Sequence, residues 1–171
     1  MEPNKKVSVI VFVRDNQEEL EAFLAMMKLQ TYKNYEIIIV DESEGLITYN
    51  DWGQTSKEKA GLKAEGELLV FPNADAYYVP TFLETMTKPH NEGIAEITYC
   101  DYLRHHNNYS YNDSKPELGH IGIVNFMINK ELFNKTGWPN KGSCGDFYTI
   151  KAGIDAGGRI VKVPGVLCVN N

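Results

Sequence analysis

Residues 67–76, ELLVFPNADA, carry the strongest fold signal in this chain. Four apolar residues, 68–71, predict a short buried strand, and a polar tip with Asp75 follows them. A second apolar run, 35–40, ends in the same way at Asp41 and Glu42. Ligands of open α/β sheets bind just beyond the carboxyl ends of the strands. The two tips together predict a site for a nucleotide, a divalent cation or both, although each carboxylate alone also suits a loop or a helix cap.

The first segment of the chain predicts a strand, a helix and a second strand in parallel. Val7–Val13 reads VSVIVFV, a run typical of a central strand that is covered on both faces. The next segment has an apolar stripe from Leu20 to Met27 at helical spacing, with Asn16 as a cap and Glu19 in a capping-box position. A strand–helix–strand start implies a right-handed parallel crossover.

The rest of the chain continues this alternation. Strands are expected at residues 46–49, 97–99, 121–127 and 159–163, and helices at 56–64, from Pro80, at 130–133 and at 146–156. Residues 102–116 are rich in His, Asn, Tyr, Ser and Asp, which predicts an exposed loop. No internal repeat and no linker-like segment is present, so we expect one mixed α/β domain over residues 1–171.

Composition narrows the class of protein. The 171 residues are 43% hydrophobic and 23% charged, as in ordinary globular proteins, and the net charge of −6 gives no general attraction to nucleic acid or anionic lipid. The polar start and the absence of a long apolar run predict neither a secretory signal nor a membrane span. Three widely spaced cysteines without a metal-ligand pattern predict a reduced, cytoplasmic protein.

Several of these motifs together resemble a known family. Five segments occur in the order found in family 2 glycosyltransferases of the GT-A fold. They are QTYKNYEIIIVD at 30–41, AGLKA with GE at 60–67, the Asn-Ala-Asp tip at 73–75, GWP at 137–139 and GDF at 145–147. The resemblance covers nearly the whole chain. It implies a Rossmann-like GT-A domain with a mostly parallel central sheet flanked by helices. It also implies an inverting transfer of a sugar from a nucleoside diphosphate, typically UDP, to a hydroxyl acceptor.

The resemblance also implies roles for residues at the ends of the first two strands. Val13 and Asp15 would line the pocket for the nucleotide base. Asp41 would hydrogen-bond the base, typically a uracil, and Glu42 would lie beside it.

The remaining implied roles concern the metal and the chemical step. Asn73 and Asp75 stand where the family carries Asp-x-Asp, which holds Mg²⁺ or Mn²⁺ on the diphosphate. Asp146 matches the general base that deprotonates the acceptor. We expect the helix macrodipole to favour its charged form, although Asp146 also suits a purely structural place in the first helical turn.

The sequence departs from the family at several of these positions. Asn73 brings no charge, Ala76 replaces a further Asp, Glu58 and Lys59 replace an Arg-Asn pair, and Gly145 stands where Glu is common. An amide oxygen still ligates a cation but binds it more weakly than a carboxylate. These departures permit an alternative: a non-catalytic GT-A domain that binds a nucleotide or nucleotide sugar, or that serves as a protein-interaction module.

The acceptor side is less defined. The candidates are Tyr109, Tyr111, His120 and Trp138, with His120 expected to open a strand beside the site. The tyrosines equally suit a polar surface loop, and Trp138 equally suits the core. Because longer relatives continue past the position of Asn171, we expect acceptor binding to use residues 102–116, another subunit of a homo-oligomer, or a partner protein. A saccharide acceptor is expected, and a modified nucleobase is the alternative.

Two further clusters are interpreted as ordinary surface. His105 and His106 point to opposite faces of an extended segment and lack a ligand framework, so we expect loop histidines. Lys57, Lys59 and Lys63 are expected to form a solvated helix face rather than a phosphate clamp.

Overall fold

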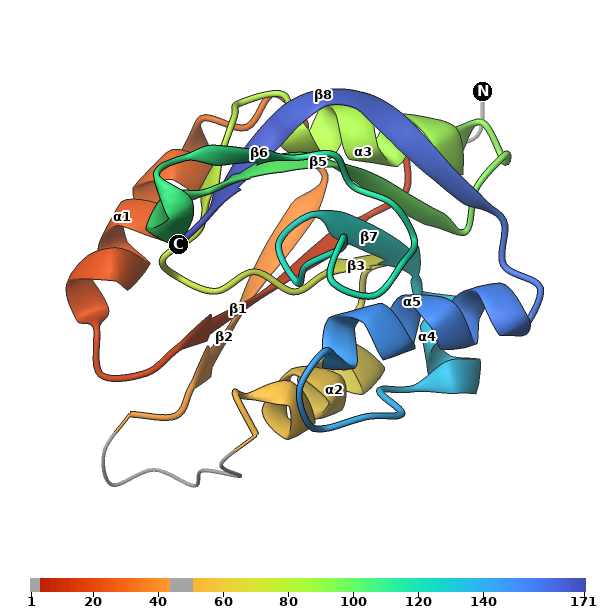
Figure 1. Ribbon diagram of the computed structural model, residues 1–171, viewed down its shortest axis with the longest axis horizontal. Coiled ribbons are helices and arrows are strands. Elements are labelled where there is room, and N and C mark those ends of the chain that lie inside the picture. The colour runs from red at the N-terminus through yellow and green to blue at the C-terminus, as the bar shows by residue number, and fades with distance from the viewer. Residues whose placement is uncertain (1–3, 44–50) are drawn as a thin grey trace.

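The computed structural model describes residues 4–43 and 51–171 and shows one sheet with helices on both faces (Figure 1). Its strands are β1 (Val7–Val13), β2 (Tyr35–Asp41), β3 (Leu68–Val70), β4 (Tyr77–Tyr78), β5 (Ile97–Arg104), β6 (Ser110–Asn112), β7 (Phe126–Asn129) and β8 (Ile160–Asn170). Its α-helices are α1 (Gln17–Lys28), α2 (Gln54–Lys63), α3 (Phe82–Asn91), α4 (Lys130–Thr136) and α5 (Gly145–Asp155), and η1 (His105–Asn107) is a 3₁₀ turn. The strand expected at 46–49 lies outside the described residues.

The sheet has the order β2-β1-β3-β7-β5-β8-β4, with β6 paired to β5. β1 runs parallel to both β2 and β3, as the strand–helix–strand pattern predicts. β7 is antiparallel to β3 and to β5, and β4 and β6 are also antiparallel to their neighbours. The α/β fold is therefore confirmed, but the sheet is mixed rather than mostly parallel. The mixed character arises at β4, β6 and β7, because no crossover α-helix precedes these strands. Antiparallel pairing needs only a turn or loop between strands.

Two apolar cores sandwich the sheet. Alternate residues of β1, from Val7 to Val13, face α1 and α3, while Ile10 faces α2, α4 and α5. Figure 1 shows these two helix layers on opposite sides of the strands. Coverage of both faces explains why β1 is apolar along nearly its whole length, and it confirms the interpretation of this strand as central.

Helix α1 follows the sequence pattern closely. The Asn16 side chain accepts a hydrogen bond from the Glu19 backbone N–H at 3.2 Å, which caps the helix as expected. Leu20, Phe23 and Met27 are buried against the first core. The cap fixes where α1 starts and therefore how the loop after β1 leaves the sheet edge.

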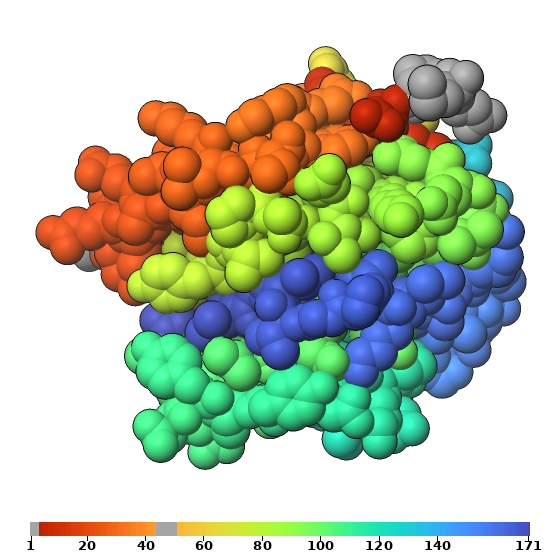
Figure 2. Space-filling view, turned by 90° about the horizontal axis from the view of Figure 1, so that it is seen from above, coloured from red at the N-terminus to blue at the C-terminus, as the bar shows by residue number. Residues whose placement is uncertain are grey.

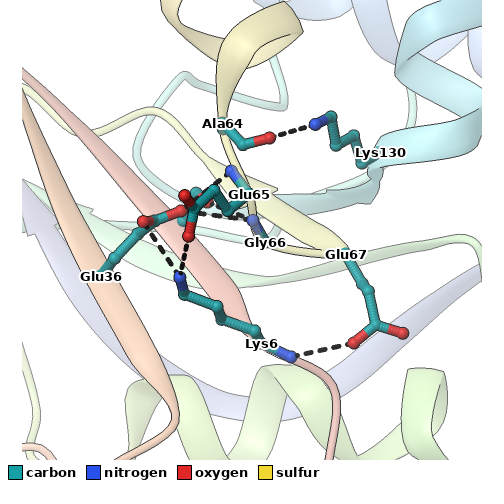
Figure 3. A network of polar contacts seen from close by, with 8 residues as sticks. Lys6, Glu36, Ala64, Glu65, Gly66, Glu67 and Lys130 are labelled. Carbon is teal, nitrogen blue, oxygen red and sulfur yellow. Dashed lines mark hydrogen bonds and ion pairs between the residues drawn. The ribbon is translucent and has the colours of Figure 1, made fainter.

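The turn between α2 and β3 is held by a polar network at the other end of the sheet (Figure 3). A Glu36 carboxylate oxygen accepts from the backbone N–H of Glu65 at 3.0 Å and of Gly66 at 3.2 Å, and Lys6 Nζ pairs with Glu36 at 3.1 Å and with Glu65 at 2.9 Å. A Cβ on Gly66 would lie 2.5 Å from Ser8 Oγ, so only glycine fits there. This network sets the register of β3 against β1.

The second half of the chain differs more from expectation. Residues 102–116 are not simply an exposed loop, because they contain the end of β5, η1 and the antiparallel β6. Asp101 anchors them: it accepts from the Ser114 N–H at 2.7 Å and from the Tyr111 hydroxyl at 2.8 Å. β8 is also longer than expected and lies between α3 and the segment that contains β6 (Figure 2). Long-range pairing with β5 extends both strands.

Within residues 4–43 and 51–171, no helix combines the length and apolarity needed to cross a bilayer. Cys100, Cys144 and Cys168 are free thiols, with Cys144 alone exposed.

Candidate functional site

The carboxyl ends of β1, β2 and β3 meet at one edge of the sheet. Val13 is in register with Asp41 on β2. The tip after β3 is tied to β1 because the Ala74 N–H donates to the Phe12 carbonyl at 2.8 Å and the Phe12 N–H donates to the Pro72 carbonyl at 2.9 Å. The two acidic tips, with Asp41 after β2 and Asp75 after β3, thus lie at one edge of the sheet, as predicted.

Two adjoining cavities open at this edge. The Asp75 cavity, of about 180 Å³, is lined by Phe12, Val13, Arg14, Glu19, Trp52, Asn73, Ala74 and Asp75. The Asp146 cavity, of about 260 Å³, is lined by Trp52, Gln54, Lys57, Asn73, Ile123 and residues 142–146. Trp52 and Asn73 belong to both walls. Asp75 and Asp146 therefore face neighbouring compartments of one trough, which we define as these two cavities together.

A larger cavity, of about 710 Å³, lies along α3 and is lined by residues that include Tyr32 and Glu84. It is remote from the carboxyl ends of β1 and β3. Size alone would favour it, but ligands of α/β sheets bind at the carboxyl edge, and the buried Lys57 together with Asp75 and Asp146, whose pKa values are shifted by burial, lines the two cavities there. We therefore place the candidate site in the trough.

Lys57 is the central residue that the sequence interpretation missed. Its side chain is 1% exposed, so the expected solvated face is wrong at this position. Its Nζ donates to Asn73 Oδ1 at 2.6 Å and lies 4.9 Å from the centre of the Phe12 ring. Burial lowers the pKa of Lys57 to about 7, against the opposing field of the nearby carboxylates, Asp75 first.

The burial of Lys57 follows from how α2 docks. The buried residues of α2 are Gln54, Lys57 and Gly61, which share one face of the helix at spacings of three and four. This face packs on β1, β2 and α4. The signal in the sequence for the burial of this face is a set of polar residues at helical spacing around Gly61. Because this face has few apolar residues, the opposite face of the helix looked equally suitable for burial.

Asp75 is only partly satisfied by its neighbours. Its Oδ1 is buried and has no hydrogen-bond partner among the described residues. Burial raises the pKa of Asp75 above its usual range, although Lys57 acts in the other direction. Glu19, which the sequence interpretation used only for the helix cap, lines the same cavity, and burial together with the Asp75 charge raises its pKa too.

Asp146 lies in the first turn of α5, with its Oδ1 accepting from the Phe147 N–H at 2.8 Å. Burial raises the pKa of Asp146, and the amides of the helix start and the Lys57 charge only partly offset it. The expectation that the macrodipole would favour the charged form is therefore wrong in net direction, because desolvation outweighs it. A higher pKa makes this carboxylate a stronger base.

The neighbouring Gly145 has a steric explanation. A Cβ there would lie 2.5 Å from the Asn140 carbonyl and 2.7 Å from Trp138 Nε1. The start of α5 is packed so tightly against these groups that the Glu which the sequence resemblance implies at this position does not fit.

Asp41, Glu42 and Asp15 have different surroundings. Asp41 accepts from the Ser43 N–H at 2.9 Å and from the Ser43 hydroxyl, which holds its pKa below the usual range. Glu42 is 1% exposed and is engaged by Arg14 at 2.6 Å and by the Ser56 hydroxyl. Asp15 is exposed, and its N–H donates to Ser43 Oγ at 3.0 Å. These three residues line neither cavity and lie beside the trough, at the end of β2 and the loop after β1.

The predicted acceptor residues do not gather at the trough. Tyr109 and Tyr111 are exposed on the η1–β6 segment, and the Tyr111 hydroxyl is used by Asp101. His120 is exposed in a turn before β7 and does not open a strand, because β7 begins only at Phe126. Trp138 is 2% exposed and donates through Nε1 to Gln54, so it packs in the core and has no free ring face for a sugar. The exposed aromatic ring at the trough is Trp52, at 77%.

Comparison with known proteins places this geometry in a known fold. No protein-family model matches the sequence, and comparison with curated proteins finds no match. Among solved structures, S. aureus TarS 1–349 in complex with UDP aligns with a TM-score of 0.78 at 17% identity, over 96% of this chain and 60% of that one. The mannosyltransferase PcManGT from Pyrobaculum calidifontis, in complex with GDP-Man and Mn²⁺, aligns with a TM-score of 0.75 at 18% identity, over 99% of this chain and 57% of that one.

This chain has the GT-A fold. The fold named from the sequence motifs is therefore confirmed. The chain spans 60% of the TarS 1–349 chain, 36% of a longer TarS structure and 57% of PcManGT. At identities of 17% and 18%, the likeness shows the fold alone.

A divalent cation at the GT-A tip fits these residues poorly. In the part of the chain that the structure describes, no group of three or more His, Cys, Asp or Glu side chains is placed to hold a metal ion. The Asn73 oxygen, which would be the second ligand beside Asp75, already accepts from the Lys57 ammonium. A metal ion bound at that oxygen would face a like charge at close range. The unpartnered Asp75 oxygen is one ligand atom, and a sugar hydroxyl would satisfy it equally well.

Proposed function

We propose that this chain is an inverting glycosyltransferase that moves a sugar from a nucleoside diphosphate, UDP, to a hydroxyl acceptor. The GT-A fold supports a nucleotide-sugar substrate. The observation that carries the proposal is the trough itself, in which the half-buried carboxylates of Asp75 and Asp146 lie on two sides of Asn73. Acids whose pKa values are raised by burial in one cleft are typical of catalytic sites.

In this proposal Asp146 is the general base. It would accept the proton from the acceptor hydroxyl as that oxygen attacks the anomeric carbon, from the side opposite to the departing diphosphate. Its raised pKa suits the task because a stronger base takes the proton more readily. The exposed residues 142–144 beside it leave that cavity open to an acceptor.

The nucleotide would occupy the other end of the edge. Asp41, Asp15 and Val13 would lie around the base, and the ribose or the donor sugar would supply a hydroxyl to the unpartnered Asp75 oxygen. Trp52, exposed on the wall shared by both cavities, would pack its ring on the sugar. The acceptor would be a saccharide, since a net charge of −6 gives no attraction to a nucleic acid acceptor.

The alternative is a GT-A domain that binds the nucleotide sugar without turnover. The specific observation in its favour is the Lys57–Asn73 hydrogen bond, which occupies the oxygen that a catalytic metal ion would use. The two proposals agree on nucleotide binding and differ on chemistry.

Thermal unfolding and donor consumption test both. UDP at about 100 times its dissociation constant should stabilise the chain by about 2.7 kcal/mol, and uridine should stabilise it less at equal concentration. Slow release of UDP from a panel of UDP-sugars, with and without added saccharides, is the expected sign of the enzyme. Binding without turnover of any donor would favour the binding domain. No stabilisation by any nucleoside diphosphate would contradict both.

A further inference from the structure

We propose that Lys57 takes the place of the divalent cation at this site, so that the chain binds the diphosphate of its nucleotide without a metal ion. The inference rests on the proposed function, because it assigns the group that neutralises the diphosphate of that substrate. It differs from what the PcManGT structure contains, which is Mn²⁺.

The first support is the position of the ammonium group. Lys57 reaches from the first half of α2 into the wall of the Asp146 cavity, and Asn73, its hydrogen-bond partner, forms the wall shared with the Asp75 cavity. The ammonium group therefore lies at the junction where a diphosphate would pass between the base and the transferred sugar. Lysine is a common phosphate ligand that acts as a point charge.

The second support is the kind of partner that Lys57 has. A buried ammonium group is normally paired with a carboxylate at hydrogen-bond distance. Here the partner at 2.6 Å is the neutral amide of Asn73, although Asp75, Asp146, Glu42 and Asp51 all contribute to the field at Lys57. Glu42 is bound instead to Arg14 and to the Ser56 hydroxyl. An anionic ligand in the trough would supply the counter-charge that the amide lacks, and it would favour the charged form of Lys57, whose pKa burial lowers to about 7.

The third support is the chemistry of Asn73 at the tip. Its amide oxygen brings no negative charge to a divalent cation, and it already accepts a hydrogen bond from Lys57 Nζ. The same side chain therefore suits a lysine better than a metal ion.

The alternative to a phosphate ligand is a purely structural role for Lys57. In that alternative, Lys57 only reduces the repulsion among the four surrounding carboxylates. That role would affect folding, and it would change the affinity for uridine and for UDP by similar factors. A diphosphate ligand predicts a change for UDP alone.

Isothermal titration of UDP and uridine, in EDTA and in Mn²⁺, provides the test. The intact chain should bind UDP with the same affinity in both buffers, to within about twofold, and should bind UDP more tightly than uridine by about tenfold or more. Lys57→Met should lose about tenfold or more in UDP affinity while changing uridine affinity by less than about twofold. Lys63→Met, which removes an exposed charge from the same helix, should leave both affinities unchanged.

Three results would overturn the inference. One is a gain of about tenfold or more in UDP affinity on addition of Mn²⁺. Another is an unchanged UDP affinity in Lys57→Met. The third result concerns Lys57→Arg, which keeps the charge and is used if Lys57→Met fails to fold. Lys57→Arg should bind UDP in EDTA. A folded Lys57→Arg that does not bind UDP would overturn the inference. If the intact chain bound no UDP in either buffer, the proposed function itself would fail, which is a different outcome from binding that needs Mn²⁺.

Discussion

The two acidic tips of the sheet are alike in sequence and opposite in their electrostatics. Asp41, at the end of β2, is satisfied by the N–H and hydroxyl of Ser43, and its pKa is lowered. Asp75, after β3, has a buried oxygen without a hydrogen-bond partner among residues 4–43 and 51–171, and its pKa is raised by burial. A satisfied carboxylate stabilises its own loop, whereas an unsatisfied buried one costs stability unless a ligand completes it. In the function that we propose, the chemical step therefore takes place beside β3 rather than β2.

Asp146 belongs with Asp75 in this contrast. It is half-buried, burial raises its pKa, and it lines the adjoining cavity. The charges of Asp75 and Asp146 both act on the buried Lys57, while Asp41, which Ser43 satisfies, lies beside the trough. The predictions below would break or refine this division.

The largest effect is expected at Asp146. Asp146→Asn keeps the shape of the side chain but removes the base, so the rate of sugar transfer should fall by about 10²–10⁴-fold. UDP affinity should change by less than about threefold, because the residue lies on the acceptor side of the trough. The rate with a UDP-sugar substrate and the affinity by titration are the two measurements.

Asp155→Asn is the matched control for this change. Asp155 lies on the same helix, is exposed, and pairs with Lys151 at 2.6 Å. Its loss should leave the rate within about twofold, as expected for an exposed ion pair. Equal losses in the two variants would contradict a special role for Asp146.

A difference in stability between the two tips is expected next. Asp41→Asn breaks satisfied hydrogen bonds to a charged group and should lower the free energy of unfolding by about 1–2 kcal/mol. Asp75→Asn removes a buried charge without a full set of partners and should leave that free energy unchanged or raise it by up to about 1 kcal/mol. Urea unfolding measures both, and a loss at Asp75 as large as that at Asp41 would remove the contrast.

The aromatic residues refine where the sugar lies. Trp52→Ala should weaken binding of a UDP-sugar by about fivefold, or about 1 kcal/mol, with little change in stability because the ring is exposed. Tyr109→Ala, on the η1–β6 segment away from both cavities, should leave this affinity unchanged. Titration of both variants with a UDP-sugar measures the two affinities. A larger loss in Tyr109→Ala than in Trp52→Ala would contradict this placement of the sugar.

The smallest effect is a difference in pH dependence. Because the native pKa of Asp41 lies below its ordinary 3.8, its contribution to stability is present above pH 3.8 and is lost as the pH falls through the native pKa. Asp75 has a raised native pKa, so its cost to stability is present at neutral pH and is relieved as the pH falls through that value. The free energy of unfolding of Asp41→Asn and of Asp75→Asn should therefore approach that of the intact chain on acidification. The two differences should have opposite signs, since Asp41→Asn loses stability at neutral pH and Asp75→Asn does not.

Local patterns in the sequence were sufficient for the first half of the fold. The apolar run of β1, the Asn16 cap and the stripe of α1 depend on neighbours within a few residues, and all three are confirmed. The acidic tips at one sheet edge followed from the parallel order of β2, β1 and β3. Motif order was enough to name the GT-A fold.

The second half and the centre of the site depend on contacts between distant residues. The lengths of β5 and β8 come from their mutual pairing, and the antiparallel β7 comes from its place between β3 and β5. Lys57 is buried because α2 docks over the end of β1, which no local pattern around a lysine predicts. The pKa of Asp146 rises for the same reason, since desolvation depends on the assembled site.

A crystal structure of the chain with UDP, grown in the presence of EDTA, tests the central claim most directly. The account predicts the diphosphate in the trough with an oxygen about 2.8 Å from Lys57 Nζ, and the uracil at the end of β2 near Asp41. UDP bound elsewhere, or bound in the trough only after addition of Mn²⁺ with its phosphates away from Lys57, would contradict it.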